Sequence, residues 1–85
     1  MDQVWKYLLT PVCGIELPLN AKILKVAVQN GEVYVWVQGD SELPKYTAKF
    51  MSFGTGQPIP DDLRLNYLDT VFLDALVYHV YEVLG

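Results

Sequence analysis

The stretch that decides the fold is Ala21–Gln38, which reads AKILKVAVQNGEVYVWVQ. In it, two alternating apolar runs flank Asn30 and Gly31, and this pattern is the strongest short-range signal for a β-hairpin with a two-residue turn. Both central residues of a type I′ turn need a positive φ, which Asn and Gly tolerate best. The sequence therefore predicts two antiparallel strands joined at Asn30 and Gly31.

The turn also predicts which residues face each other across the hairpin. Counting outward pairs Gln29 with Glu32 at the turn and Leu24 with Val37 at the far end. One face is then entirely aliphatic and is expected to face the core: Leu24, Val26, Val28, Val33, Val35 and Val37. The other face is expected to carry Lys25, Ala27, Gln29, Glu32, Tyr34 and Trp36. A shift by one residue would mix the two faces, so the pairing is well specified.

Strand-like segments lie on both sides of this hairpin. Before it come Val4–Leu9, which Pro11 ends, and a short extended piece at Ile15–Leu17. After it, Tyr46–Phe53 alternates loosely and also reads as a strand.

The C-terminal stretch Leu65–Leu84 admits two interpretations. Read as strands, it forms a second hairpin of Tyr67–Leu73 and Leu76–Val83 across Asp74 and Ala75. Read as a helix, it shows an apolar stripe but no continuous polar face. Its many Val, Tyr, Thr and Phe residues favour strands. We therefore expect an all-β domain over residues 1–85, a small antiparallel meander of five to six strands with little or no helix, which forms a compact barrel or sandwich.

Composition restricts the classes of partner. Of the 85 residues, 52% are hydrophobic, which is rich for a small monomer and favours self-association. Six basic and ten acidic residues give a net charge of −4, without the basic footprint of a protein that binds duplex nucleic acid.

The single cysteine, Cys13, excludes an internal disulfide and a structural zinc site and favours a reduced, intracellular setting. Neither a signal peptide nor an 18-residue apolar run is visible, so no contact with a membrane is expected.

Four motifs resemble those of a family of small proteins encoded by tailed phages and prophages. The family pattern reads VWKY, GAKILxVxVQNG, GTGxPIP and LVYHVYE, and it matches this chain in the same order over nearly its whole length. The motifs lie at Val4–Tyr7, Ala21–Gly31, Gly54–Pro60 and Leu76–Glu82. The family usually has glycine where Asn20 stands, and often glycines in the final turn.

The resemblance implies a phage-encoded accessory protein in the host cytoplasm. Small phage proteins of this kind are frequently anti-defence factors. By analogy of size and class, we expect a homo-oligomeric binding protein, not an enzyme, that sequesters a small nucleotide-like immune signal without cleaving it and needs no cofactor. The alternative is a direct protein–protein inhibitor of a host defence enzyme.

The loop Gly54–Asp62 is the first place expected to hold a site. Two glycines and two prolines in nine residues exclude regular structure, and binding residues gather on loops that a rigid scaffold holds. Backbone N–H groups of Gly54, Thr55 and Gly56 could hold a phosphate, although no Lys-Ser/Thr follows to complete a phosphate loop.

Side chains elsewhere complete the predicted ligand site. His79, the only histidine, is a candidate ligand donor, and Arg64 and Lys49 are candidate charge partners for a phosphate. A separate interface is predicted at Tyr34, Trp36 and Lys25, where rings beside a cation could stack a base or grip a peptide.

Two other groups of residues carry no prediction of chemistry. Asp61, Asp62 and Asp69 fit no calcium-loop spacing, so no metal site is predicted. Cys13 lies in no recognisable nucleophile motif and is expected to be a small buried thiol.

Overall fold

The computed structural model describes all 85 residues and contains seven β-strands and no helix. The strands are β1 (Gln3–Leu8), β2 (Val12–Pro18), β3 (Lys22–Gln29), β4 (Glu32–Gly39), β5 (Lys45–Gly54), β6 (Leu65–Leu73) and β7 (Leu76–Val83). The predicted all-β fold is confirmed. The number of strands exceeds the predicted five or six because the extended piece at Ile15–Leu17 belongs to a full strand, β2. No segment of the structure is a helix long and apolar enough to cross a membrane.

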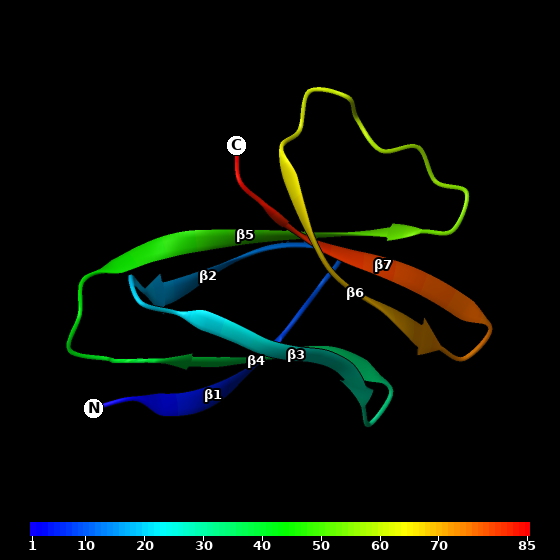
Figure 1. Ribbon diagram of the computed structural model, residues 1–85. Coiled ribbons are helices and arrows are strands. Elements are labelled where there is room, and N and C mark those ends of the chain that lie inside the picture. The colour runs from blue at the N-terminus through cyan, green and yellow to red at the C-terminus, as the bar shows by residue number, and fades with distance from the viewer.

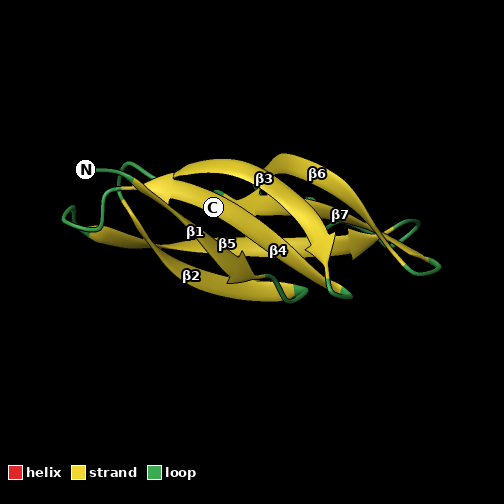
Figure 2. Cartoon of the chain, turned by 90° about the horizontal axis from the view of Figure 1, so that it is seen from below, coloured by secondary structure: helices red, strands yellow, loops and turns green.

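The strands form two antiparallel sheets that stack as a sandwich rather than a closed barrel. Sheet A has the order β1-β4-β3 and sheet B the order β2-β5-β7-β6. Figure 1 shows the two sheets as layers, and in Figure 2 the edge strand β3 of sheet A lies beside the edge strand β6 of sheet B. Each sheet therefore has one outer face and one inner face.

The β3–β4 hairpin forms as predicted at its turn. Asn30 and Gly31 have φ values of 54° and 76°, and the pairing follows the predicted register from Gln29 with Glu32 as far as Lys25 with Trp36. The predicted pairing of Leu24 with Val37 is wrong. Ile23 takes that place because Leu24 is the extra residue of a β-bulge, which leaves it 45% exposed instead of in the core.

The two inner faces supply the core. Sheet A contributes buried aliphatic side chains, and sheet B contributes aliphatic side chains around the fully buried ring of Phe50. Burial of one such side chain is worth about 1.5–3 kcal/mol, so these residues are the main source of stability. The buried cluster is Leu9, Leu17, Val26, Val35, Val37, Ala48, Phe50, Val71 and Val80.

The strand interpretation of the C-terminal stretch is confirmed. β6 and β7 form a hairpin in which Leu73 pairs with Leu76 across Asp74 and Ala75. Only Asp74 of the two turn residues has a positive φ, 55°, which is the pattern of a type II′ turn. A second bulge interrupts this hairpin, and its extra residue is Leu68.

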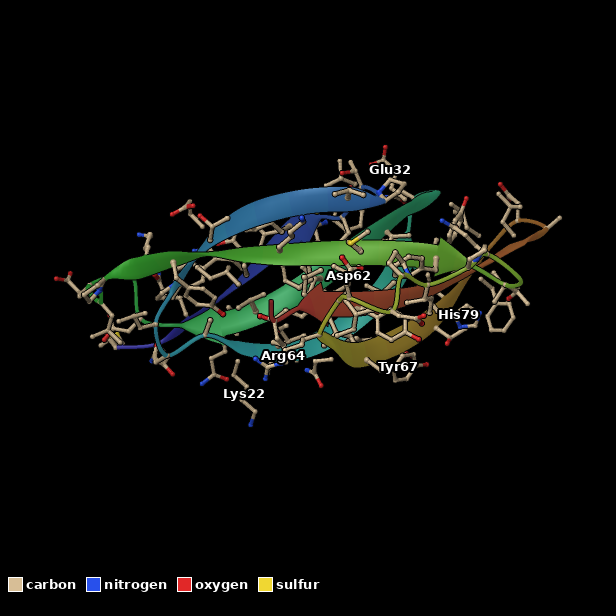
Figure 3. The ribbon with its side chains drawn as sticks, turned by 90° about the horizontal axis from the view of Figure 1, so that it is seen from above. Lys22, Glu32, Asp62, Arg64, Tyr67 and His79 are labelled. Carbon is tan, nitrogen blue, oxygen red and sulfur yellow. The ribbon has the colours of Figure 1, made fainter.

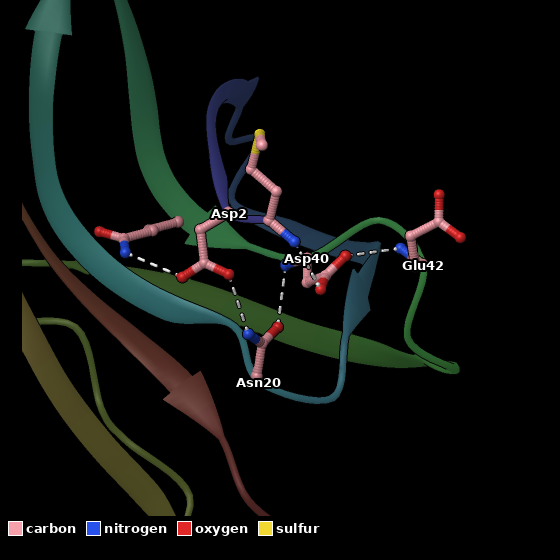
Figure 4. A network of polar contacts seen from close by, with 6 residues as sticks. Asp2, Asn20, Asp40 and Glu42 are labelled. Atoms are coloured by element: carbon pink, nitrogen blue, oxygen red, sulfur yellow. Dashed lines mark hydrogen bonds and ion pairs between the residues drawn. The ribbon is translucent and has the colours of Figure 1, made fainter.

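A polar network ties three distant segments together at one end of the sandwich (Figure 4). The carboxylate of Asp2 accepts hydrogen bonds from Gln38 Nε2 at 2.9 Å and from Asn20 Nδ2 at 3.3 Å. The side-chain oxygen of Asn20 accepts the backbone N–H of Asp40 at 2.9 Å. Asn20 thereby joins the start of the chain to the β4–β5 connection.

Asp40 extends this network into the next turn. Its carboxylate accepts the backbone N–H of Glu42 at 2.9 Å and the Met1 ammonium at 3.1 Å. These contacts favour the ionised form and lower the pKa of Asp40, the Glu42 hydrogen bond having the larger effect.

Candidate functional site

The outer face of sheet A brings an indole ring between two lysines. Lys6 on β1 and Lys25 on β3 are the two cross-strand neighbours of Trp36 on the central strand β4. Cross-strand neighbours have Cβ atoms about 4.5–5.5 Å apart, so both lysines lie beside the ring. Lys22 lies on the same face, one row along, opposite Gln38. We call Lys6, Lys22, Lys25, Tyr34 and Trp36 the aromatic–lysine face.

Tyr34 continues the aromatic column along β4. Its ring centroid lies 6.2 Å from that of Trp36, with the planes tilted by 58°. The ammonium of Lys6 lies 4.5 Å from the Tyr34 centroid, in cation–π contact, and donates a hydrogen bond to Gln29 Oε1 at 2.8 Å. The Tyr34 hydroxyl donates to Glu32 at 3.1 Å, which raises the pKa of Tyr34. These contacts hold the ring and Lys6 in place without a ligand.

Charge is unevenly distributed over the molecule. Three of the six basic residues of an otherwise acidic chain lie on the aromatic–lysine face, and all three are exposed. Figure 3 shows Lys22 projecting away from the sandwich. Two carboxylates lie at the ends of this face: Glu32 at the hairpin end, which accepts the Tyr34 hydroxyl, and Asp2 at the other end, which accepts Gln38 Nε2. The middle of the face, around Trp36, is therefore locally cationic.

The predicted ligand residues Thr55 and His79 do come together, on the outer face of sheet B. Thr55 Oγ1 lies 2.8 Å from His79 Nε2, and Thr70 Oγ1 lies 2.9 Å from His79 Nδ1. Tyr67 continues the chain, with its hydroxyl 2.6 Å from Thr70 Oγ1. Since a hydroxyl both donates and accepts, both ring nitrogens of His79 are fully engaged inside the protein. This chain of side chains fastens the start of the β5–β6 loop to β6 and β7.

Gly54, Thr55 and Gly56 form a closed turn. The N–H of Gly54 donates to Gln57 Oε1 at 3.0 Å, and the N–H of Thr55 donates to the Val77 carbonyl at 3.2 Å. Gly56 has a φ of 89°, which explains the glycine there. Two of the three N–H groups expected to hold a phosphate are thus occupied, and the turn does not present the free set that such a cradle needs.

A shallow cavity of about 380 Å³ adjoins this turn. No charged side chain lines it, so it offers nothing to neutralise a phosphate. Its lining residues are Gly54, Thr55, Gln57, Ala75, Leu76, Val77 and Tyr78.

Lys49 and Arg64, the predicted phosphate partners, lie elsewhere. Lys49 pairs with Val83, four residues along β5 from the Phe53–His79 pair, which places it about 13 Å away along the strand. Arg64 exchanges backbone hydrogen bonds with the C-terminal segment, and Figure 3 shows Arg64 and His79 well apart. The structure therefore divides the predicted ligand set into two groups.

Sequence reasoning missed Lys6 and Lys22 as members of the aromatic–lysine face. The alternation in Val4–Leu9 does place Lys6 on the face away from Trp5 and Tyr7. No local signal shows that β1 pairs with β4, however, and that pairing alone brings Lys6 to Trp36.

Comparison with known proteins identifies a family. A domain of unknown function, DUF7352, matches residues 1–84. The chain matches no curated protein and no solved structure. Because the family match spans nearly the whole sequence, the protein belongs to the DUF7352 domain family.

Proposed function

We propose that this protein is a non-enzymatic binding protein that captures a small nucleotide-like ligand on the aromatic–lysine face. A nucleotide presents a flat base and an anionic phosphate, and the two need different partners. Aromatic side chains stack bases at about 1–3 kcal/mol per base, and ammonium groups pair with phosphates. The aromatic–lysine face offers both kinds of group within one row of the sheet.

The position of Trp36 between Lys6 and Lys25 carries the proposal. A base stacked on the indole would leave its phosphate within reach of one or the other ammonium group. Cation–π contact and the hydrogen bond to Gln29 already hold Lys6, so little side-chain freedom is lost on binding.

The GTG turn is not the capture site in this proposal, although the sequence favoured it. It has no adjacent cation, and its polar groups form hydrogen bonds that stabilise the fold.

The cysteine and the histidine support a non-enzymatic role, because they lie on opposite faces of sheet B. Cys13 pairs with the inward-facing Phe50, whereas His79 pairs with Phe53 on the outer face. They do not form a nucleophile–base pair.

The biological setting we propose follows the family resemblance. In it, the protein is encoded by a phage, acts in the host cytoplasm, self-associates, and withholds a nucleotide signal of host immunity without cleaving it. Sequestration requires only tight binding and slow release, both of which a rigid, preformed face favours.

Fluorescence of Trp36 tests this proposal directly. In a Trp5→Phe background, Trp36 is the only tryptophan, and a panel of mono-, di- and cyclic nucleotides should include one that quenches its emission. Lys6→Ala and Lys25→Ala should each weaken that ligand's binding about tenfold, the cost of one charge-assisted contact. Lys49→Ala, on the other sheet, is the matched control and should change nothing. Denaturation should return the ligand intact.

The proposal fails if no nucleotide quenches Trp36, or if Lys49→Ala weakens binding as much as Lys25→Ala. Recovery of an altered ligand would show an enzyme instead.

Direct inhibition of a host defence protein is the second candidate, and the β6–β7 hairpin favours it. Phe72 is 71% exposed and Leu76 54% exposed near the end of this hairpin. Exposed aromatic side chains of this kind are typical anchors in protein interfaces. If this candidate holds, a host protein should co-purify with the wild type and the Trp36→Ala variant, but not with Phe72→Ala.

A further inference from the structure

The two β-bulges face each other across the open seam of the sandwich. Leu24 is the extra residue of β3 and Leu68 that of β6, and these two edge strands lie beside each other (Figure 2). A bulge bends its strand away from regular pairing. Between the two bulges lies a groove of about 510 Å³, within the size range of small-molecule sites.

Glu82 gives this groove a negative charge. It pairs with Phe50 on one side and Asn66 on the other, and since the Phe50 ring is buried in the core, Glu82 is directed between the sheets. Glu82 forms no ion pair, because the one ion pair in the structure joins Met1 to Asp40, and Lys25 is the one basic residue that lines the groove. Burial raises the pKa of Glu82, and its charge adds to burial in raising the pKa of Tyr46, which also lines the groove.

The remaining walls of the groove are partly acidic and partly apolar. Asp69 adds a second carboxyl group, which accepts the N–H of Thr70 at 2.8 Å through one oxygen. Ile23, Leu24 and Leu68 add apolar surface. A half-buried carboxylate beside apolar walls is left without the partner that a buried charge requires.

We propose that this groove binds a small organic ammonium ion, a primary amine or guanidinium group on a short apolar or aromatic body. The cationic group lies between Glu82 and Asp69, where charge-assisted hydrogen bonds replace the water that the carboxylates have lost. The body packs on Leu24 and Leu68. This site is separate from the aromatic–lysine face and does not depend on a nucleotide being bound there.

Lys25 connects the two sites with opposite consequences. It lines the groove and also neighbours Trp36. Its ammonium repels a cation in the groove and attracts a phosphate on the outer face. Lys25→Ala should therefore tighten amine binding while it weakens nucleotide binding, so the failure of one proposal is distinguishable from the failure of the other.

Benzylamine and its uncharged analogue benzyl alcohol are the matched probes. Titration of ¹⁵N-labelled protein at neutral pH, followed by NMR, should shift the amide signals of Leu24, Leu68 and Glu82 with benzylamine. Benzyl alcohol should bind about tenfold more weakly or worse, because it lacks the charge. Glu82→Gln should weaken benzylamine about tenfold, and Asp69→Asn is the second variant if the first does not fold. Glu42→Gln, on an exposed turn, should have no effect.

Three results would overturn the proposal. The first is equal binding of benzylamine and benzyl alcohol, which would show an apolar groove only. The second is unchanged benzylamine affinity in folded Glu82→Gln or Asp69→Asn. The third is the absence of shifts at millimolar benzylamine.

Discussion

Gly39 lies directly against the ring of Pro18, so closely that a Cβ on Gly39 would be 2.5 Å from Pro18 Cγ. Gly39 ends β4 of sheet A and Pro18 ends β2 of sheet B, and both are buried. This contact is one of the points where the two sheets meet. The glycine is therefore required by space, since its φ is not in the left-handed region.

Gly39→Ala should destabilise the protein by about 1–3 kcal/mol, because the added methyl group would overlap the buried ring of Pro18 and force the two strand ends apart. Thermal unfolding followed by circular dichroism measures the loss. Gly54→Ala is the control, because a Cβ at Gly54 would have no neighbour nearer than 3.9 Å. The Tm of this variant should be close to that of the wild type. Equal Tm values for the two variants would contradict the packing argument.

A substitution in the turn between β6 and β7 should stabilise the protein. Asp74 has a φ of 55°, and the first central position of a type II′ turn favours glycine. Asp74→Gly should raise the free energy of unfolding by up to about 1 kcal/mol. Ala75→Gly, where φ is negative, should instead lower it by about 0.5–1 kcal/mol through chain entropy. Urea unfolding of both variants provides the comparison, and the reverse order of stabilities would refute the assigned turn.

Glu82 should make stability depend on pH in a defined direction. Burial raises its pKa in the folded chain above the value in the unfolded chain. Folding therefore favours the protonated carboxyl, and this stabilisation is full below the unfolded pKa and is lost as pH rises through the folded pKa. At neutral pH, Glu82→Gln should melt slightly higher than the wild type, and the difference should vanish in acid. A Tm difference that grows on acidification would contradict the shift.

His79 should control the β5–β6 loop rather than a reaction. His79→Ala removes both threonine contacts and should cost about 1 kcal/mol. It should also speed hydrogen exchange at the Thr55 amide, which bonds to Val77. Thr10→Val removes a hydroxyl near the β1–β2 connection and should leave that amide unchanged. Exchange at Thr55 that is equally slow in His79→Ala would show that the loop is held by other contacts.

Local sequence signals predicted the local structure well. Asn30 and Gly31 determined a turn and five of the residue pairs that follow from it, because a two-residue loop leaves no freedom in register. The composition of the C-terminal stretch distinguished strands from helix for a similar reason, since β-branched and aromatic residues suit a pleated surface.

What the sequence could not predict depends on contacts between distant segments. The bulges at Leu24 and Leu68 arise where two sheet edges pass each other, and neither position carries a glycine or another local signal. The groove between them, with Glu82 on its wall, was therefore missed. Lys49 and Arg64 were assigned to the ligand site by charge alone, and the register of β5 with β7 separates Lys49 from His79.

The strand order has a consequence for synthesis. β1 pairs with β4 and β2 pairs with β5, so neither of the first two strands pairs with a strand next to it in the chain. On the ribosome, β1 remains without its partner until residues up to Gly39 have emerged, and β2 until residues up to Gly54 have emerged. The β3–β4 hairpin can close in microseconds and is the first template available to the nascent chain. Assembly of the sandwich then waits for translation, and during that interval β1 and β2 are open to capture by a chaperone.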